Sequence, residues 1–321
     1  MTFPKLALSA LFLLAAFAGL TLWRAHARER AAEAAYPPEG QIVEVAGQRV
    51  HLVVQGRAQG EAPDVVLIHG SSGSTRDMTF ALAPALAERY RVISVDRPGL
   101  GWSARDADGA SLARQAQLLQ GAVAQVGADR PIVVGQSYGG AVALTWALDY
   151  PDQTAALVTL SSPAFPWEGG LSLFYKITSS ALGQALIVPL ITAWVPRSKI
   201  TSELQSVFKP QTMPEGYGDY FGPRMTLRRS ALAANGEQRA ALKPQMAAMV
   251  ARYRDMTLPV EIVHGTADTT VSPRIHALPL LAALPNAAYT PLDGIGHMPQ
   301  HVAIPQVVAA IDRAAARAQL R

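Results

Sequence analysis

The sequence predicts an α/β fold: a doubly wound, mostly parallel sheet of eight strands, with a helical cap inserted between two strands and a transmembrane helix at the N-terminus. Short apolar runs rich in β-branched residues alternate with helical segments, which is typical of a parallel sheet covered by helices on both faces. The stretch 164–256 then interrupts this alternation and shows no strand pattern of its own. With 321 residues, half of them hydrophobic, the chain is long enough to bury one large core.

The N-terminal helix is predicted from Leu6–Trp23, an uncharged and mostly apolar run of the length that crosses a bilayer. Lys5 precedes this run, and Trp23 closes it as an interfacial aromatic residue. We favour an uncleaved membrane anchor followed by a linker over 24–40. The alternative is a secretory signal cleaved near Ala25-His26-Ala27, which would leave a secreted or periplasmic protein. The side of the membrane that the catalytic domain faces stays open.

The sheet begins with a predicted hairpin over 42–45 and 49–54, in which Gly47 provides the turn. Further strands are expected where near-continuous apolar runs are bounded by turn residues or helices. These runs cover 65–68, 91–95, 132–134, 156–160, 260–263 and 288–292, and helical segments over roughly 76–89, 111–127 and 140–149 separate the first of them.

The cap is the least patterned part of the chain and is rich in proline and aromatic residues. Within it, Ala181–Val195 is apolar but too short to span a bilayer, and Pro189 interrupts it. We interpret it as a helix packed over the core, with a face that dips into the membrane as the alternative. The predicted division is an anchor and linker over 1–40, a core over 41–163 and 257–321, and the cap over 164–256.

Composition excludes several kinds of site. The chain has no cysteine, which rules out disulfides, a thiolate nucleophile and zinc held by cysteine. Its net charge of +4 comes with no basic and aromatic stripe, so no nucleic-acid partner is expected. No group of histidines and carboxylates has metal-binding spacing, and no glycine-rich loop with a lysine could cradle phosphate. We therefore expect neither a metal nor a cofactor.

The candidate nucleophile is Ser137, in the sequence Gly135-Gln136-Ser137-Tyr138-Gly139. The pattern G-x-S-x-G occurs here between a predicted strand and a predicted helix, the setting in which such a turn exposes a nucleophilic serine. Glycines are needed because the sharp turn brings backbone atoms into close contact. The alternative is a serine that merely caps the helix in a glycine-rich turn.

Three further motifs follow predicted strands, at the edge of the sheet where open α/β folds place their sites. His69-Gly70-Ser71 follows the strand 65–68, Asp268 follows 260–263, and His297 follows the last strand. The chain order serine, aspartate, histidine is that of the α/β-hydrolase triad.

With Asp96-Arg97-Pro98-Gly99-Leu100-Gly101-Trp102-Ser103, which is similar to the D-x-P-G-x-G-x-S loop of that family, the chain resembles the α/β-hydrolase fold superfamily over roughly 41–321. The resemblance is to its cap-bearing esterase and lactonase-like serine hydrolases. A serine needs a neighbouring base, a histidine can exchange the proton, and an aspartate can hold the imidazole. We expect Ser137 as nucleophile, His297 as base, Asp268 as acid, and the backbone N–H groups of Ser71 and Tyr138 as the oxyanion hole.

The expected function is hydrolysis of a small, lipophilic ester or lactone, with the membrane as a partner through the N-terminal helix. The alternative within enzymes is a C–C bond hydrolase or a cofactor-free haloperoxidase or perhydrolase that uses the same triad. A binding protein of hydrolase fold with a vestigial site is the alternative from another class.

Other polar residues compete for these roles. His301 could replace His297 as base, but its place one helical turn later favours a supporting or surface residue. Asp293 could replace Asp268 but more simply shapes a turn. His69 and His264 are expected to organise loops, Asp96 to brace its own loop, and Arg228-Arg229 to lie on the solvated surface of the cap.

Overall fold

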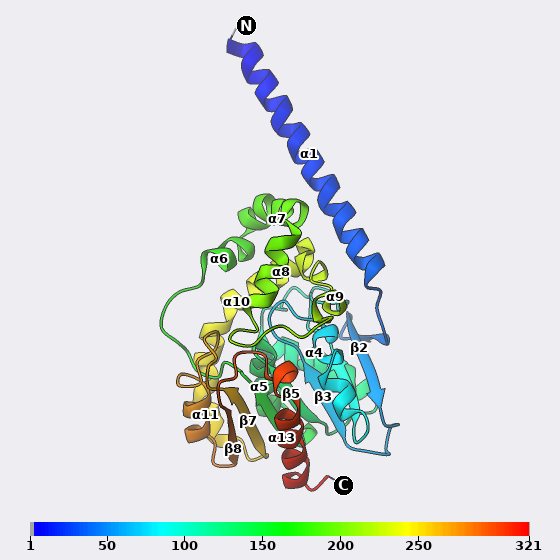
Figure 1. Ribbon diagram of the computed structural model, residues 1–321, viewed down its shortest axis with the longest axis vertical. Helices are drawn as coiled ribbons and strands as arrows, with labels where there is room; N and C mark the ends of the chain where they lie inside the picture. Colours follow the sequence, from blue (N-terminus) through cyan, green and yellow to red (C-terminus); the bar gives the residue numbers. More distant parts are fainter. Residues whose placement is uncertain (1–2, 321) are drawn as a thin grey trace.

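A computed structural model describes residues 3–320; residues 1–2 of the expected anchor and residue 321 of the expected core lie outside it. One eight-stranded sheet in the order β1-β2-β4-β3-β5-β6-β7-β8 forms the lower half of the molecule (Figure 1). Strand β2 is antiparallel to both its neighbours, and β3 to β8 are parallel. The predicted fold class is thereby confirmed. The strands are β1 (Gln41–Val45), β2 (Gln48–Gly56), β3 (Asp64–Ile68), β4 (Arg91–Val95), β5 (Ile132–Gln136), β6 (Ala156–Leu160), β7 (Val260–Gly265) and β8 (Ala287–Leu292).

The predicted hairpin is formed by β1 and β2, in which Val45 pairs with Gln48. The two residues of its turn both have positive φ angles, 48° at Ala46 and 76° at Gly47. A two-residue turn with this geometry matches the right-handed twist of the strands, which is why a glycine is favoured in it.

Helices cover both faces of the sheet, and each face has its own buried apolar cluster. On one face Ile68 and Val95 pack against helices that follow β4, β5 and β7, and on the other Leu67 and Val134 pack against the helices after β3 and β8. The first group is α4 (Leu112–Gln125), α5 (Tyr138–Asp149) and α11 (Ala277–Ala283); the second is α2 (Thr75–Thr79), α3 (Leu82–Leu86) and α13 (Ile304–Arg317), with the short α12 (Pro299–Val302) before it.

The single helix predicted over 76–89 is wrong, because α2 and α3 are separate. Ala81, between them, has φ −141°, outside the helical region. Pro84 has no N–H to donate and would break a longer helix, but it is accommodated in the first turn of α3, where that N–H has no partner in any case.

The chain between β6 and β7, here called the insertion, is helical and lies between the sheet and the N-terminal helix in Figure 1. Its exact division from the core at 164 and 256 stays a prediction. In the stretch 181–195, Val188, Thr192 and Ala193 are buried, whereas Leu182 and Leu186 are exposed, so one side packs and the other faces outward. Its helices are α6 (Leu173–Ser179), the π-helix η2 (Gly183–Ile187), α7 (Val188–Trp194), α8 (Arg197–Ser206), α9 (Tyr217–Phe221), η3 (Met225–Leu227), α10 (Arg229–Met249) and η4 (Val250–Asp255).

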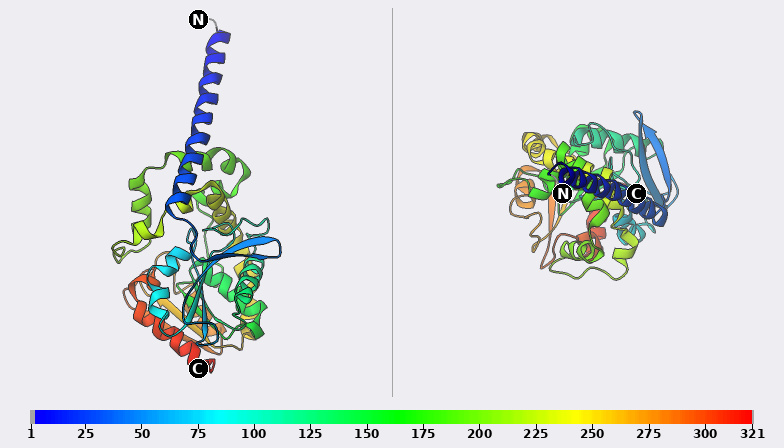
Figure 2. Two further views of the ribbon diagram at one scale, coloured as in Figure 1. Left: turned by 90° about the vertical axis from the view of Figure 1, so that its right-hand side faces the viewer. Right: turned by 90° about the horizontal axis from the view of Figure 1, so that it is seen from above.

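Helix α1 (Phe3–Ala35) projects from the body as one continuous rod, as the left view in Figure 2 shows. Its segment Ala7–Ala35 is long and apolar enough to be a candidate membrane span. The linker expected from residue 24 is wrong up to Ala35, because the alanine, arginine and glutamate residues there are strong helix formers.

Two ion pairs hold the end of α1 against the insertion. Arg229 binds Glu29 through two nitrogens, at 2.9 and 2.7 Å, and Arg228 binds Glu33 at 3.0 Å. Arg228 is 9% exposed, so the expectation that this arginine pair is solvated is wrong. The glutamates that pair with the two arginines lie about two hundred residues earlier in the chain, so no local sequence pattern could indicate the pairing.

Trp194 at the end of α7 contacts the middle of α1. Its ring stacks on Phe17 with centroids 6.0 Å apart, and its Nε1 donates to Thr21 Oγ1 at 3.1 Å. The guanidinium of Arg24 lies 4.6 Å from the same ring. The C-terminal half of α1, from Phe17 onward, is therefore packed on the insertion by apolar, polar and charged contacts.

Candidate active site

Ser137 occupies the turn between β5 and α5, with φ 50°. A non-glycine residue rarely adopts this left-handed conformation, which stores strain at the serine. The neighbouring glycines permit the turn: a Cβ on Gly135 would lie 2.3 Å from the carbonyl oxygen of Gly139, and one on Gly139 would lie 2.3 Å from that of Ile68. The local sequence is thus the one that this turn requires.

The structure brings Ser137, His297 and Asp268 together at the carboxyl ends of β5, β8 and β7. His297 Nε2 lies 3.0 Å from Ser137 Oγ, and His297 Nδ1 lies 2.8 Å from Asp268 Oδ2. All three are buried, with 7, 6 and 5% of their surfaces exposed. In this arrangement Nδ1 donates to the carboxylate, so the lone pair on Nε2 can accept the proton of the serine hydroxyl.

Asp268 is held in its ionised form. Its Oδ1 accepts the backbone N–H groups of Thr270 and Val271 at 2.8 and 2.9 Å. Burial alone would raise the pKa of the Asp268 carboxyl, but hydrogen bonds from His264 and His297 outweigh burial and hold it well below its usual range. A permanent negative charge therefore faces Nδ1 of His297.

The two expected oxyanion donors belong to segments next to the serine: Tyr138 follows Ser137 directly, and Gly70, which precedes Ser71, lies so close that a Cβ on it would be 3.1 Å from Ser137 Cβ. Tyr138 is the first residue of α5, where a backbone N–H has no partner within the helix. Within 3–320 neither its N–H nor that of Ser71 donates a hydrogen bond. Both donors are therefore available, and the positive end of the α5 dipole points to the same place.

The two competing residues lie elsewhere. Asp293 is exposed and accepts a hydrogen bond from Thr266 at 3.2 Å, so no contact joins it to His297. His301 is buried rather than on the surface: its Nε2 lies 2.8 Å from Asp77 Oδ1, to which the Tyr217 hydroxyl also donates at 2.7 Å. This cluster ties α12, just after His297, to α2 and α9.

His69, His264 and Asp96 organise loops, as expected. His69 accepts the N–H of Arg97 at 3.0 Å and donates to the carbonyl of Gly70 at 2.9 Å. Burial lowers its pKa to about 4, so it is neutral. Asp96 accepts backbone N–H groups of Thr75 and Trp102, and His264 Nε2 bonds the carbonyl of Val271.

Several polar residues around the site were not anticipated from the sequence. Gln136 donates to the carbonyl of His297 at 3.1 Å, which ties the serine turn to the histidine loop. Arg97 is fully buried behind His69 and Gly70. Asn235 and Gln238 of α10 reach the same loops, and their three-residue spacing on a helix was the only signal that could have marked them as one face.

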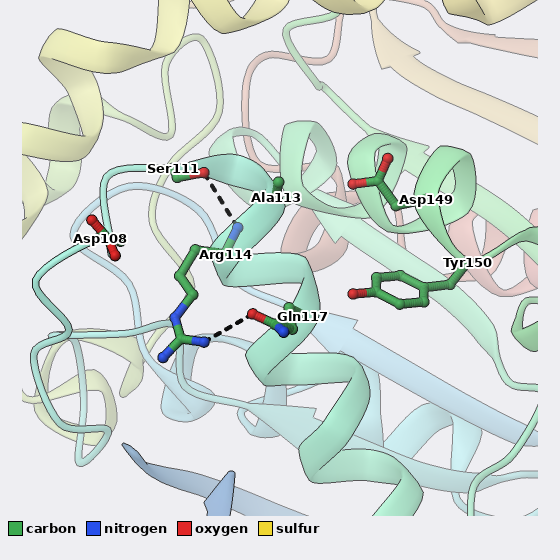
Figure 3. A pocket seen from close by; sticks show the side chains of 7 residues that line it. All are labelled: Asp108, Ser111, Ala113, Arg114, Gln117, Asp149 and Tyr150. Carbon is green, nitrogen blue, oxygen red and sulfur yellow. Dashed lines mark hydrogen bonds between the residues drawn. The ribbon is translucent and has the colours of Figure 1, made fainter. Parts of the chain in front are cut away.

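A cleft drawn in Figure 3 is separate from this site. It lies at the start of α4 and the end of α5, where Arg114 is bonded to Gln117. Asp149 in the cleft ends the helix that begins next to Ser137, and twelve residues of helix span about 18 Å. Among the residues that the structure describes, no cluster of side chains is placed to hold a metal ion.

Comparison with known proteins agrees with the fold. The model of the alpha/beta hydrolase family matches residues 65–311. A 2-hydroxymuconate semialdehyde hydrolase of Pseudomonas putida is 28% identical over 82% of this chain and 89% of its own length. A membrane phospholipase A superposes with a TM-score of 0.67 at 18% identity, covering 97% of this chain and 99% of that one. The enol-lactonase of Burkholderia xenovorans LB400 superposes with a TM-score of 0.66 at 17% identity, covering 85% and 100%.

Proposed function

The chain belongs to the alpha/beta hydrolase family and is a hydrolase, and on that premise we propose that it cleaves an ester or a lactone by acyl transfer through Ser137. The observation that carries the proposal is the continuous hydrogen-bonded path from Ser137 Oγ through His297 to Asp268. At the end of this path the Asp268 carboxyl is held in its ionised form.

The proposed reaction has two halves. Ser137 Oγ attacks the carbonyl carbon while its proton passes to His297 Nε2, and the N–H groups of Ser71 and Tyr138 bind the resulting oxyanion. The C–O bond to the alcohol then breaks, and His297 returns the proton to the departing oxygen. A water molecule next gives a proton to His297 and attacks the acyl group, and Ser137 leaves with that proton. In a lactone the alcohol stays attached to the released acid.

A fluorophosphonate probe on the full-length protein in detergent tests the nucleophile. The wild type should be labelled, S137A should not, and S206A on the exposed part of α8 should label like the wild type. A wild type that resists labelling would refute the serine mechanism.

We further propose that the substrate is lipophilic. The insertion exposes large apolar side chains next to the helix that carries the candidate span, and such patches mark surfaces that meet apolar partners. Burial of each added methylene is worth about 0.8 kcal/mol, or roughly fourfold in kcat/KM. A series of p-nitrophenyl esters of increasing acyl length should therefore show a rise; a flat series would contradict this part alone. The exposed residues are Leu173, Phe174, Leu182, Leu186 and Ile187.

Helix α1 is proposed to be a retained membrane anchor rather than a cleaved signal. Contacts of Phe17, Thr21 and Arg24 with the insertion would be lost on cleavage after residue 27. The superposed membrane phospholipase A covers 97% of this chain, so the likeness extends into the 33 residues of α1. Intact mass spectrometry of the membrane fraction tests this, since a mature chain that begins near residue 28 would contradict it.

A second candidate function is hydrolysis of a C–C bond in an unsaturated oxo acid. Two relatives are named as hydrolases of unsaturated acids of this kind, 2-hydroxymuconate semialdehyde hydrolase and 2-hydroxy-6-oxo-6-phenylhexa-2,4-dienoate hydrolase. Burial raises the pKa of the Tyr138 hydroxyl, and the charges of Arg97 and of Arg239 on α10 oppose this rise, so Arg239 lies within electrostatic reach of the residue next to Ser137. Within 3–320 Arg239 forms no ion pair, which favours this second function. An anionic substrate would need such a partner. Hydrolysis of a carboxylated dienone that R239A abolishes, with no activity on neutral esters, would replace the first proposal by this one.

A further inference from the structure

We propose that Arg97 is a positioning residue of the oxyanion hole, and that α10 of the insertion holds it in place through Gln238 while Asn235 fixes the adjoining residue. The inference rests on the proposed oxyanion role of Ser71. It assigns a function to a buried cation that the triad does not use, and it makes the insertion part of the machinery that stabilises the oxyanion.

Arg97 forms hydrogen bonds to the loop that carries the N–H donor of Ser71. Its side chain is fully buried, its Nε donates to the carbonyl of His69 at 3.0 Å, and its Nη2 donates to the carbonyl of Gly70 at 2.9 Å. The backbone N–H of Arg97 also donates to His69 Nε2 at 3.0 Å. The loop is thus bound by one residue at consecutive carbonyl groups and at a side chain.

These bonds fix the direction of the donor. The carbonyl of Gly70 and the N–H of Ser71 belong to the same peptide group, which is planar and trans, so the two point in opposite directions. An arginine that holds the carbonyl on one side therefore aims the N–H to the other side. Rotation of this peptide, which would turn the donor away from the oxyanion, would break the Nη2 bond.

Within residues 3–320, no carboxylate is paired with the guanidinium of Arg97. Among the described residues its side chain forms no ion pair, and its Nη1 contacts only the neutral amide oxygens of Gln115 and Gln238, at 3.1 and 2.6 Å. Burial lowers its pKa to about 10, which leaves it charged at neutral pH. A buried, unpaired cation is costly in the resting protein, and a negative oxygen nearby would offset that cost.

The second oxyanion donor is supported by the same group. The guanidinium lies 4.3 Å from the centre of the Tyr138 ring, and Tyr138 provides the other N–H. The positive charge of Arg97 therefore lies close to the residues that provide both N–H donors. The surroundings are buried, and in such a setting electrostatic effects on a transition state are large.

Helix α10 completes the assembly from the insertion. Gln238 accepts from Arg97 and donates to the carbonyl of Pro98 at 2.8 Å, which places the guanidinium. Asn235 accepts the N–H of Ser72 at 2.9 Å and donates to its Oγ at 3.0 Å. Ser72 has φ 53°, a conformation that costs energy without such support. The residue that follows the donor is thereby clamped as well.

Variants of Arg97 test the positioning role in the full-length protein. R97M should lower kcat roughly 10- to 100-fold with KM changed less than about threefold, because a misaimed donor acts on the transition state. R97K should recover part of kcat. R91K, at a buried arginine paired with Asp64 on the far end of β4, is the matched control and should keep kcat. A folded R97M with kcat within twofold of the wild type would overturn the proposal.

Affinity for a trifluoromethyl ketone, which forms an oxyanion on the serine, gives a readout that a general packing defect would not move. It should fall in R97M and in N235A by the same factor as kcat. Loss of kcat without loss of this affinity would refute the role. Should R97M not fold, R97K carries the same test, because a lysine cannot bind the carbonyl groups of His69 and Gly70 together as the guanidinium does.

Gln238 separates the charge from the geometry. Q238E keeps an acceptor for Arg97 but neutralises its charge, whereas Q238M removes both hydrogen bonds of the amide. If the positive charge of Arg97 stabilises the oxyanion, kcat should be lower in Q238E than in Q238M. If only the placement of the Arg97 side chain matters, kcat should be lower in Q238M than in Q238E. If the wild type itself failed to react with fluorophosphonate, the proposed serine mechanism would fall first, and the two failures would be distinguished.

Discussion

Replacement of Asp268 by asparagine tests the acid of the proposed triad, and the structure determines how the new amide would lie. Oδ1 of Asp268 accepts the N–H groups of Thr270 and Val271, while Oδ2 accepts Nδ1 of His297. In D268N the amide oxygen would keep the two backbone bonds, so its NH₂ group would face His297. The histidine must then accept at Nδ1 and carry its proton on Nε2, where it can no longer take the proton of Ser137.

The expected loss follows from this tautomer. An asparagine at such a position leaves the geometry intact and lowers kcat by about 10⁴, which is roughly 5.4 kcal/mol of transition-state stabilisation. Steady-state hydrolysis of a p-nitrophenyl ester measures kcat, and the rate of labelling by a fluorophosphonate reports on the nucleophile independently.

The matched control is D293N, at the exposed aspartate that neighbours His297 in sequence and bonds only Thr266. It should keep kcat within about twofold, because a surface hydrogen bond of this kind contributes little. A D268N variant that retains more than a tenth of the wild-type kcat, or a D293N variant that loses as much as D268N, would refute the assignment.

Three further outcomes concern stability, each measured by urea denaturation of the full chain in detergent. Because the pKa of Asp268 is lowered in the folded protein, its contribution to stability is complete above about pH 4 and is lost as the pH falls further, so the stability difference between wild type and D268N should stay constant from about pH 7 to pH 5 and shrink steadily below about pH 4; a difference that does not shrink below about pH 4 would contradict this. G139A places a Cβ 2.3 Å from a carbonyl oxygen and should cost more than about 2 kcal/mol, whereas G170A, with open space around it, should cost under 0.5 kcal/mol. Y217F removes a buried hydrogen bond to Asp77 and should cost about 1–3 kcal/mol; no loss would mean that water replaces the hydroxyl.

The strands of the sheet and the proposed catalytic residues could be predicted from the sequence, because both appear as local sequence patterns. A strand buried on two faces is an apolar run, as at 65–68 and 132–134, and it is recognisable without knowledge of its neighbours. The loops that follow such strands meet at one edge of the sheet, which is why Ser137, Asp268 and His297 could be grouped before any distance was known.

Contacts between distant segments could not be predicted in this way. Arg229 and Glu29 are two hundred residues apart, and neither residue's neighbours indicate the other. The pairing of His301 with Asp77 depends on how α12 meets α2, which no periodicity encodes. The expectation of a solvated arginine pair failed for this reason: charged residues in an amphipathic helix look the same whether water or a glutamate of another helix faces them.

Helix α1 has a mechanical consequence. A flexible linker would let the body tumble beneath its point of attachment, but twelve residues of unbroken helix, from Arg24 to Ala35, form a stiff strut of about 18 Å. The ion pairs of Glu29 and Glu33 with Arg229 and Arg228 hold this helical segment against the body and restrict its rotation relative to it. If the apolar half of α1 is the proposed membrane anchor, the body is held at a fixed distance from the membrane and in a fixed orientation to it. A molecule that diffuses within the membrane would then always approach the same side of the protein. Its encounter with that side would need diffusion in two dimensions only, with the orientation of the protein relative to the membrane already fixed.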